Sequence, residues 1–362
     1  MRRYVVTVVG DGASSHRDRS AVLGEWIAQS GYHLITGGGG GVMAAVTESF
    51  VESIGREGVA VGIIPGSVAT REHTLIYHTK GAAYPNHAVE IAVFTPLPGE
   101  DPQSERSRNH ITVLSADLVI ALPGGVGTYA EIQLAKRYGK PVVLFLIEGD
   151  TIFGKSVGDL AREGFMIIGN FPALMEAGNR ILQPERLMRP PVRLKLAKCA
   201  LRSWEWADAE PLQRHANNRK VSRNLHDFFP SPYTMLDARR WLARCLSAAM
   251  ETAFAIEVDG EAIGGIGFVL KEGPASRSAE LGYWLGEQYW GRGIAADCTR
   301  ALSAYVFDRY PDICRLYAQV FPWNTGSMRV LEKAGYSQEC VLKKAALKAG
   351  EVIDIVQYAL IR

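Results

Sequence analysis

Short apolar runs alternate with amphipathic segments through the first half of the chain. The runs show little polar alternation, and several are rich in β-branched residues. Such runs are typical of strands covered on both faces of a parallel sheet, whereas apolar residues spaced three and four apart indicate helices. The alternation predicts a doubly wound, Rossmann-like parallel α/β sheet. Strands are expected at residues 4–10, 32–35, 59–64, 90–95, 118–122 and 141–146, and helices at residues 21–27, 42–54 and 132–138.

Residues 67–87 lack either pattern and are expected to form an irregular, exposed loop. They contain His73, His78 and His87, whose spacing fits no metal-ligand motif. No metal site is therefore expected.

Three polar or glycine-rich loops follow predicted strands, at residues 11–15, 37–41 and 123–128. The carboxyl ends of parallel strands lie at one edge of a sheet, so these loops are expected to meet. Backbone N–H groups at a helix start have no intrahelical partner and can bind a phosphate. A plain turn remains an alternative for Ser14 and its neighbours. The candidate phosphate-binding residues are Gly10, Ser14, Gly38, Gly39, Gly40, Gly124, Gly125, Gly127 and Thr128.

The sequence Pro-Gly-Gly-Val-Gly-Thr-Tyr-Ala-Glu at residues 123–131 resembles the motif of the LOG family. Members of that family are phosphoribohydrolases, which cleave nucleoside 5'-monophosphates to a free base and ribose 5-phosphate. The glycines at 37–41 match the family's other glycine loop, and Arg108 stands where the family carries its active-site arginine. Asn109 replaces the lysine that is usual in cytokinin-activating members, so the identity of the base stays open.

The resemblance implies catalytic roles for Arg108 and Glu131. The arginine would bind the phosphate or the leaving charge, and the carboxylate would act on the sugar or on water. Cleavage of an N-glycosidic bond passes through an oxocarbenium-like state, which a nearby carboxylate stabilises. Proteins with this motif are sometimes labelled lysine decarboxylases. Pyridoxal phosphate is not expected, because these residues supply no Schiff-base lysine.

Paired prolines at 190 and 191 separate two differently patterned regions and indicate a short, stiff linker. The expected organisation is a nucleotide-binding domain at residues 1–188, a linker at 189–192 and a second domain at 193–362.

In the second region an alternating strand at 278–285 leads into a glycine turn and then a helix pattern at 296–307. Together with the segment from Asn324 to Tyr336, this stretch resembles the GNAT acetyltransferases, specifically the branch that acetylates ribosomal-protein N-termini and related amines. The resemblance implies an α+β fold with a mixed sheet. It also implies that acetyl-CoA is the cosubstrate and that its binding residues are Gly291, Arg292, Gly293, Ile294, Ala295 and Asn324.

Two further roles follow from this resemblance. Ser327 is expected near the thioester, where it would protonate the departing thiolate. Glu280 is the candidate base that deprotonates the amine, a group whose pKa is near 10. Residues 222–236 are expected to shape the acceptor pocket. As alternatives, Asn324 is a good helix N-cap and Glu280 a possible strand-surface charge.

Composition narrows the function classes. The 362 residues are 47% hydrophobic, which suffices for two cores. The net charge is only +2, so neither DNA nor a membrane surface is an expected partner. No apolar run approaches the roughly 20 residues of a membrane span, and the start runs directly into a strand. The five cysteines show no Cys-x-x-Cys spacing and fit a reduced, cytoplasmic setting, with most of them simply packed.

These patterns predict a bifunctional enzyme, with nucleoside 5'-monophosphate hydrolysis in the first domain and amine acetylation in the second. In the main alternative, the first domain is a nucleotide sensor or scaffold without turnover. In a third interpretation, the second domain acetylates protein N-termini. By analogy with the LOG family, a homodimer formed through the N-terminal domain is expected.

Overall fold

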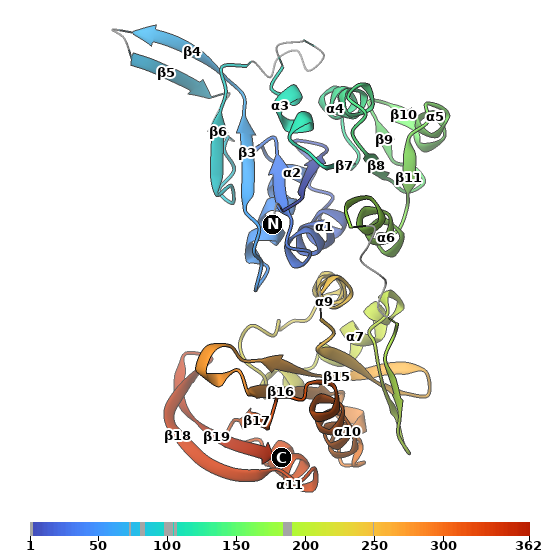
Figure 1. Ribbon diagram of the computed structural model, residues 1–362. Coiled ribbons are helices and arrows are strands. Elements are labelled where there is room, and N and C mark those ends of the chain that lie inside the picture. The colour runs from blue at the N-terminus through green and yellow to red at the C-terminus, as the bar shows by residue number, and fades with distance from the viewer. Residues whose placement is uncertain are drawn as a thin grey trace. The chain divides into compact units, whose positions relative to one another are not determined.

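The computed structural model describes residues 3–71, 74–79, 84–97, 104, 107–183, 190–248 and 250–362. The chain divides into two compact units (Figure 1). The first comprises Met1–Met188 and Ser247–Ala249, and the second comprises Arg189–Leu246 and Met250–Arg362. None of the described helices is both long and apolar enough to cross a lipid bilayer.

Within its described residues, the first unit contains a seven-stranded sheet in the order β11-β8-β7-β1-β2-β3-β6. Every neighbouring pair is parallel, which confirms the predicted sheet type. The central strands are buried, apart from the partly buried Val5, and almost free of polar residues, as helices on both faces require. The strands are β1 Val5–Val9, β2 His33–Thr36, β3 Ala60–Ile64, β6 Ile91–Phe94, β7 Leu118–Ala121, β8 Val142–Phe145 and β11 Met166–Ile168.

Helices cover both faces of this sheet (Figure 1). Two successive residues of β7 point to opposite faces of the sheet. Val119 packs in an apolar cluster with Ile132 of helix α4 (Val126–Arg137), whereas Leu118 lies next to Gly178 of helix α6 (Phe171–Leu182). The helices are α1 Arg17–Gln29, α2 Val42–Glu52, α3 Asn109–Leu114, α4 Val126–Arg137, α5 Val157–Arg162 and α6 Phe171–Leu182.

The prediction of an irregular loop at residues 67–87 is wrong for residues 67–71 and 74–79, which form strands. Strands β4 Gly66–Arg71 and β5 Thr74–Thr79 form an antiparallel hairpin. The sequence conceals it because serine, threonine and histidine interrupt the apolar positions, although threonine and valine favour extended backbone. His73 lies outside the described residues, and His87 is exposed in the loop that follows. A second small hairpin pairs β9 Thr151–Ile152 with β10 Lys155–Ser156.

The described part of the second unit contains an eight-stranded mixed sheet in the order β12-β13-β14-β15-β16-β17-β19-β18. All neighbours are antiparallel except β16 and β17, which are parallel. This arrangement confirms the expected α+β fold with a mixed sheet. The strands are β12 Arg193–Lys195, β13 Ala200–Arg202, β14 Ala253–Val258, β15 Glu261–Leu270, β16 Ser278–Leu285, β17 Arg315–Val320, β18 Ser337–Lys348 and β19 Glu351–Ile361.

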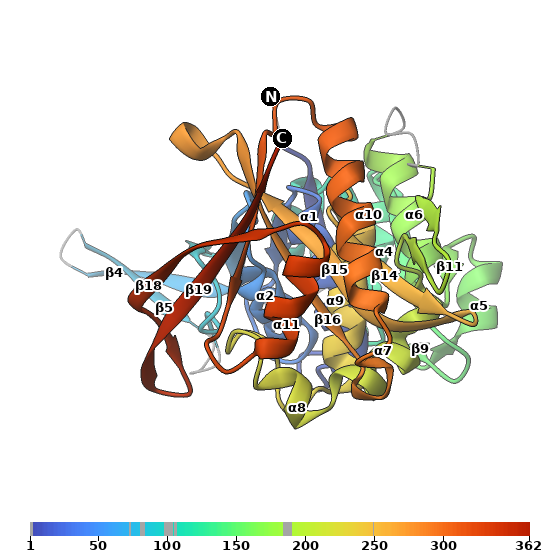
Figure 2. The same ribbon diagram turned by 90° about the horizontal axis from the view of Figure 1, so that it is seen from below.

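Two apolar clusters lie against this sheet. One joins Leu281 and Leu316 to the helix that follows β16, and Figure 2 shows that helix, α10, running over β15. The other joins Trp204 and Tyr233 to Ala255 of β14. The helices are α7 Ala209–Ala216, α8 Arg219–Ser222, α9 Met235–Ser247, α10 Ile294–Arg309 and α11 Thr325–Lys333, with 3₁₀ turns η1 Trp206–Asp208, η2 Gly273–Ala275 and η3 Glu287–Tyr289.

Candidate active sites

The three loops predicted to meet in the first unit are joined by backbone hydrogen bonds. The N–H of Asp11 donates to the carbonyl of Pro123 at 2.9 Å. The carbonyl of Asp11 accepts from the N–H of Val42 at 2.9 Å, directly after the second glycine loop. The loop after β1 therefore ties the other two together at the carboxyl edge of the sheet.

Close packing explains several glycines of the second loop. A Cβ on Gly41 would lie 2.2 Å from the carbonyl oxygen of Asp11, and its φ is +59°. Gly38 also has a positive φ, and a Cβ on Gly39 would meet the Tyr84 hydroxyl at 2.8 Å. A Cβ on Gly40 would lie 3.0 Å from the Gly12 carbonyl. The glycines bring this loop into backbone contact with its neighbours; their role in phosphate binding stays a prediction.

In the third loop, Gly124 is closely packed, whereas Gly125 and Gly127 have open surroundings. The N–H of Gly124 donates to the Thr151 carbonyl at 3.3 Å, and a Cβ on Gly124 would lie 2.2 Å from Oγ1 of Thr128. In contrast, a Cβ on Gly125 or Gly127 would meet no atom within 4 Å. Gly125 is the N-cap of α4 and supplies no side-chain cap. The open N–H groups at the start of α4 are therefore those of the residues after Gly124.

The remaining two phosphate candidates lie in the first loop. A Cβ on Gly10 would touch Val42 at 2.8 Å, so this glycine permits β1 to approach α2. Ser14 is exposed. The Asp11 carboxylate accepts the Ala13 N–H at 2.8 Å and closes the turn, as the alternative interpretation of this loop expects.

Arg108 is buried and contacts two separate elements. Its Nη1 donates to the carbonyls of Gly37, at 2.9 Å, and Ile63, at 2.7 Å. Among the described residues, its buried Nε has no hydrogen-bond partner. Arg108 is the N-cap of α3 rather than a residue on a helix face. It therefore holds the second glycine loop in place, and its role in catalysis stays a prediction.

Glu131 lies in the second turn of α4 and is almost fully buried, with 8% of its surface exposed. Burial raises the pKa of this carboxyl to about 7, and the positive charge of Arg108 opposes the rise. Its protonated and ionised forms are therefore both populated near neutral pH. A carboxyl group with such a pKa suits acid-base chemistry at a cleavage site.

Two residues of this site escaped the sequence analysis. The Tyr84 ring lies over the Arg108 guanidinium at 5.9 Å. The Asn86 amide nitrogen donates to the carbonyl of Gly39 at 2.9 Å, and its backbone N–H donates to that of Gly38 at 2.8 Å. Both precede β6, in the segment predicted to be an exposed loop. In the sequence, only the presence of an aromatic residue and an asparagine in a polar stretch could have pointed to a site here.

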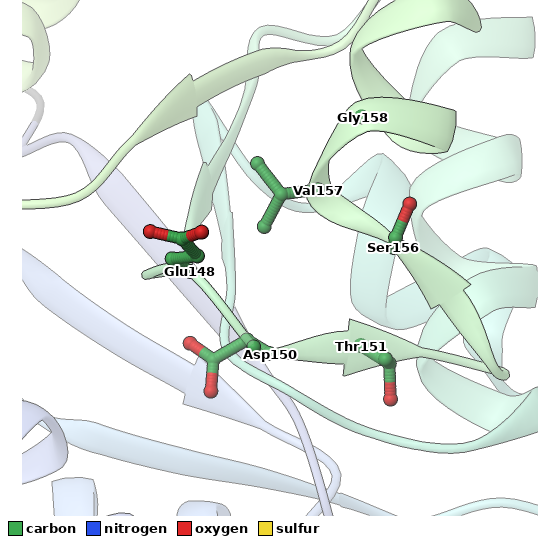
Figure 3. A pocket seen from close by; sticks show the side chains of 7 residues that line it. Glu148, Asp150, Thr151, Ser156, Val157 and Gly158 are labelled. Atoms are coloured by element: carbon green, nitrogen blue, oxygen red, sulfur yellow. The ribbon is translucent and has the colours of Figure 1, made fainter.

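A separate pocket of about 480 Å³ lies beside the β9–β10 hairpin (Figure 3). Its lining includes none of the predicted site residues. The Asp150 carboxylate in its wall is already paired with Arg19. The pocket is lined by Glu148, Gly149, Asp150, Thr151, Ser156, Val157 and Gly158.

In the second unit, the parallel strands β16 and β17 pair only over their first halves. Ser278–Glu280 pairs with Arg315–Tyr317, but β16 continues to Leu285 and β17 continues to Val320. The strands thus diverge and leave backbone groups of β16 without a partner in β17. An extended ligand can bind along such an edge.

The glycine turn follows β16 and leads into α10. Gly291 and Gly293 have positive φ values of +75° and +82°, and Gly293 is the N-cap of α10 without a side-chain cap. The guanidinium of Arg292 lies over the Tyr289 ring at 5.2 Å, and the Arg292 carbonyl accepts from Nζ of Lys198 at 3.1 Å. Ile294 and Ala295 form the first turn of α10. Lys198 adds a cation that the motif does not contain. The role of this turn in acetyl-CoA binding stays a prediction.

Ser327 and Asn324 lie at the start of α11. The side-chain Oδ1 of Asn324 accepts the Ser327 N–H at 3.2 Å, so Asn324 is the N-cap. The Ser327 hydroxyl lies 2.8 Å from the hydroxyl of Tyr283, a residue of β16. Burial raises the pKa of Tyr283, which keeps that hydroxyl protonated. Sequence analysis missed Tyr283, although it lies two residues before the end of the strand that carries the motif.

Glu280 is ion-paired rather than free. Nζ of Lys271 lies 2.6 Å from its carboxylate, and the Tyr317 hydroxyl donates to it at 3.4 Å. The role of Glu280 as a base stays a prediction.

The predicted acceptor segment lies against the β18–β19 hairpin. The Asp227 carboxylate binds Nζ of Lys348 at 2.5 Å and the Ala349 N–H at 2.8 Å. Phe229 packs against Tyr233 and Trp284, whereas Phe228 is 83% exposed. The two phenylalanines therefore differ: Phe229 packs with other aromatic side chains, whereas Phe228 is exposed to solvent.

In the described part of the chain, no group of three or more histidine, cysteine, aspartate or glutamate residues is arranged to hold a metal. The candidate binding site for the acetyl-CoA expected from the sequence is the glycine turn before α10, where the helix start has no side-chain cap and Lys198 contacts the Arg292 carbonyl.

Comparison with known proteins agrees with both domains. Residues 3–165 match the model of the SLOG cluster4 family, and residues 198–337 match that of the acetyltransferase (GNAT) domain. An uncharacterized N-acetyltransferase, p20, from Bacillus licheniformis is 26% identical over 171 residues, which cover 46% of this chain and 93% of that protein. An uncharacterized protein from Archaeoglobus fulgidus is 33% identical over 159 residues, 42% of this chain and 89% of that protein. The structure of a GNAT-family acetyltransferase from Bacillus anthracis aligns at 24% identity with a TM-score of 0.42, covering 47% of this chain and 98% of that one. The chain therefore carries an acetyltransferase (GNAT) domain in its C-terminal half and a SLOG cluster4 domain in its N-terminal half.

Proposed function

We propose that this protein has two active sites. The N-terminal domain hydrolyses the N-glycosidic bond of a nucleoside 5'-monophosphate, giving a free base and ribose 5-phosphate. The C-terminal domain transfers the acetyl group of acetyl-CoA to a primary amine. A homodimer formed through the N-terminal domain is part of the proposal, and sedimentation analysis of the purified protein tests it.

The observation that carries the first activity is the buried pair of Arg108 and Glu131 at the carboxyl edge of the sheet. Glu131 has a pKa of about 7, and the charge of Arg108 acts on it. As an acid, Glu131 can protonate the leaving base; as a carboxylate, it can stabilise the oxocarbenium-like state or activate water.

The phosphate has a candidate seat at the open end of the third loop. Gly125 and Gly127 leave space around the first N–H groups of α4, and no side chain caps them. These N–H groups lie less than two helical turns before Glu131. A phosphate bound there would set the sugar next to the carboxyl group. The unpartnered Nε of Arg108 is available to the same ligand.

The divergence of β16 and β17 supports the second activity. The glycine turn before α10 offers backbone N–H groups and the Arg292 and Lys198 cations to a pyrophosphate. The free edge of β16 offers partners to the extended arm of the cosubstrate. The Ser327 hydroxyl, hydrogen-bonded to Tyr283, can pass a proton to the departing thiolate. The amine must lose a proton first, and Glu280 would accept it through water.

Direct assays test both halves. Release of ribose 5-phosphate is measured with AMP, GMP, IMP, CMP and UMP, and release of CoA from acetyl-CoA is measured with small amines and with peptides that have free N-termini. Tight nucleotide binding without turnover would mean that the N-terminal domain is a sensor rather than a hydrolase. Acetylation of peptides alone would favour the protein N-terminal acetyltransferase.

Replacing Gly293 with tryptophan should abolish acetyl-CoA binding. The bulky side chain would occupy the space before α10, and we expect the Kd for acetyl-CoA to rise by about 100-fold or more, measured by calorimetry. Gly260→Trp is the matched control, because Gly260 has a similar φ of +83° and open surroundings in the turn after β14.

Hydrolysis by the first domain should survive both changes. An unaltered acetyl-CoA affinity in Gly293→Trp would argue against this seat for the cosubstrate.

A further inference from the structure

Two cysteines far apart in the sequence meet beside the glycine turn of the second unit. The Sγ atoms of Cys199 and Cys298 lie 3.5 Å apart, and both thiols are free. Cys298 is fully buried, whereas Cys199 is only partly buried. A disulfide needs an S–S distance of about 2.05 Å, so the sulfurs have only about 1.5 Å to close.

The pair is connected to the turn from both sides. Cys199 directly follows Lys198, whose Nζ donates to the Arg292 carbonyl at 3.1 Å. The same Nζ lies 3.4 Å from the position of a Cβ on Gly293. Cys298 lies in the second turn of α10, which begins directly after Gly293. A shift of either sulfur is therefore transmitted to the turn through one peptide bond or one helical turn.

We propose that Cys199 and Cys298 form a reversible redox modification site that lowers the affinity of the protein for acetyl-CoA when it is oxidised. The effect on acetyl-CoA rests on the function proposed above for the turn, whereas formation of the disulfide does not. Oxidation draws the segment between β12 and β13 toward α10 and moves Lys198 away from the Arg292 carbonyl.

The oxidant is a peroxide, and the step has two parts. The Cys199 thiolate attacks a peroxide oxygen, the O–O bond breaks, and a sulfenic acid and hydroxide form. The Cys298 sulfur then attacks the sulfur of Cys199. The S–S bond forms, the S–O bond breaks, and the oxygen leaves as water with the Cys298 proton.

The surroundings of the two thiols indicate which of them reacts first with the peroxide. The hydrogen bond with Cys298 lowers the pKa of the Cys199 thiol, burial opposes this, and Lys198 contributes in the same direction as the hydrogen bond. The same contact and burial raise the pKa of Cys298. Cys199, partly exposed and more readily ionised, is therefore the thiol that meets the peroxide.

The test treats the full chain with hydrogen peroxide and maps its peptides by mass spectrometry without reduction. We expect a crosslink between the peptides that contain Cys199 and Cys298. The Kd for acetyl-CoA should rise about tenfold and return to its original value with dithiothreitol. Cys199→Ser should lose both responses, and Cys314→Ser, a change at a cysteine outside the pair, should keep both.

Each outcome decides part of the proposal. A sulfenic acid or no modification at Cys199, without the crosslink, would overturn the modification site. A crosslink with unchanged acetyl-CoA affinity would overturn its regulatory effect. If the reduced protein binds no acetyl-CoA but the crosslink forms, the proposed function fails and the redox site stands.

Discussion

Glu131→Gln should reduce ribose 5-phosphate release by about 10³-fold or more, because the amide can neither donate nor accept the proton that the cleavage moves. Nucleotide binding should change little, since glutamine has nearly the same shape and Arg108 keeps its bonds to Gly37 and Ile63. Product release and nucleotide affinity are measured on the same preparation. Equal loss of binding and turnover would mean that Glu131 holds the ligand rather than acting on the bond.

The same variant should be more stable than the natural protein above neutral pH. Burial raises the Glu131 pKa from an unfolded value of 4.5 to about 7, so the neutral form is favoured in the folded state. The stability that this group contributes is complete below pH 4.5 and is lost as the pH rises through 7. Each pKa unit corresponds to about 1.4 kcal/mol, so the loss above pH 7 is on the order of 3 kcal/mol.

Glutamine stays neutral at every pH and avoids this loss. Urea unfolding at pH 8 should therefore give a larger free energy of unfolding for Glu131→Gln than for the natural protein, and this difference should disappear toward pH 4.5. Glu176→Gln, at an exposed carboxylate on α6, is the control and should show no such gain. Identical pH profiles for the variant and the natural protein would contradict a buried, proton-binding Glu131.

Gly41→Ala should disrupt the site in the first domain and lower the free energy of unfolding. The added Cβ would lie 2.2 Å from the Asp11 carbonyl oxygen at a φ of +59°. A left-handed backbone costs about 1–2 kcal/mol, and the clash with a backbone oxygen adds to it, so a loss of roughly 2–4 kcal/mol is expected. The hydrogen bond between Asp11 and Val42 is also displaced, and nucleotide binding should be lost.

Gly127→Ala is the informative counterpart. This residue lies in the first turn of α4, and its Cβ would meet no atom within 4 Å. Alanine should stabilise the helix by about 0.5–1 kcal/mol. If the N–H groups of this turn hold the phosphate, nucleotide affinity should nevertheless fall about tenfold.

Urea unfolding and nucleotide calorimetry on both variants separate the two roles of glycine. Unchanged affinity in Gly127→Ala would place the phosphate elsewhere. Unchanged stability in Gly41→Ala would show that the second loop is less tightly held than its contacts indicate.

Much of the fold follows from local patterns. The apolar runs around residues 5–9 and 118–121 become the buried central strands because they have no polar face to expose. The glycine turns at 124–127 and 291–293 lie between strand and helix, as their motifs predict. The β4–β5 hairpin was missed because its strands mix polar and apolar residues without a regular period, which local patterns do not distinguish from a loop.

The candidate sites required more than patterns. Periodicity and glycine content in the sequence indicated the parallel sheet and the three converging loops. The resemblances to the LOG and GNAT families implied the mixed sheet and the roles of Arg108, Glu131 and Ser327, and these roles stay predictions. Only the tertiary structure decided that Arg108 binds the carbonyls of Gly37 and Ile63, that Tyr283 meets Ser327, and that Cys199 meets Cys298. These contacts join segments more than 40 residues apart, so packing rather than local preference creates them. The raised pKa of Glu131 also comes from tertiary packing. Burial causes it, and the segments that bury Glu131 are brought together only by the fold.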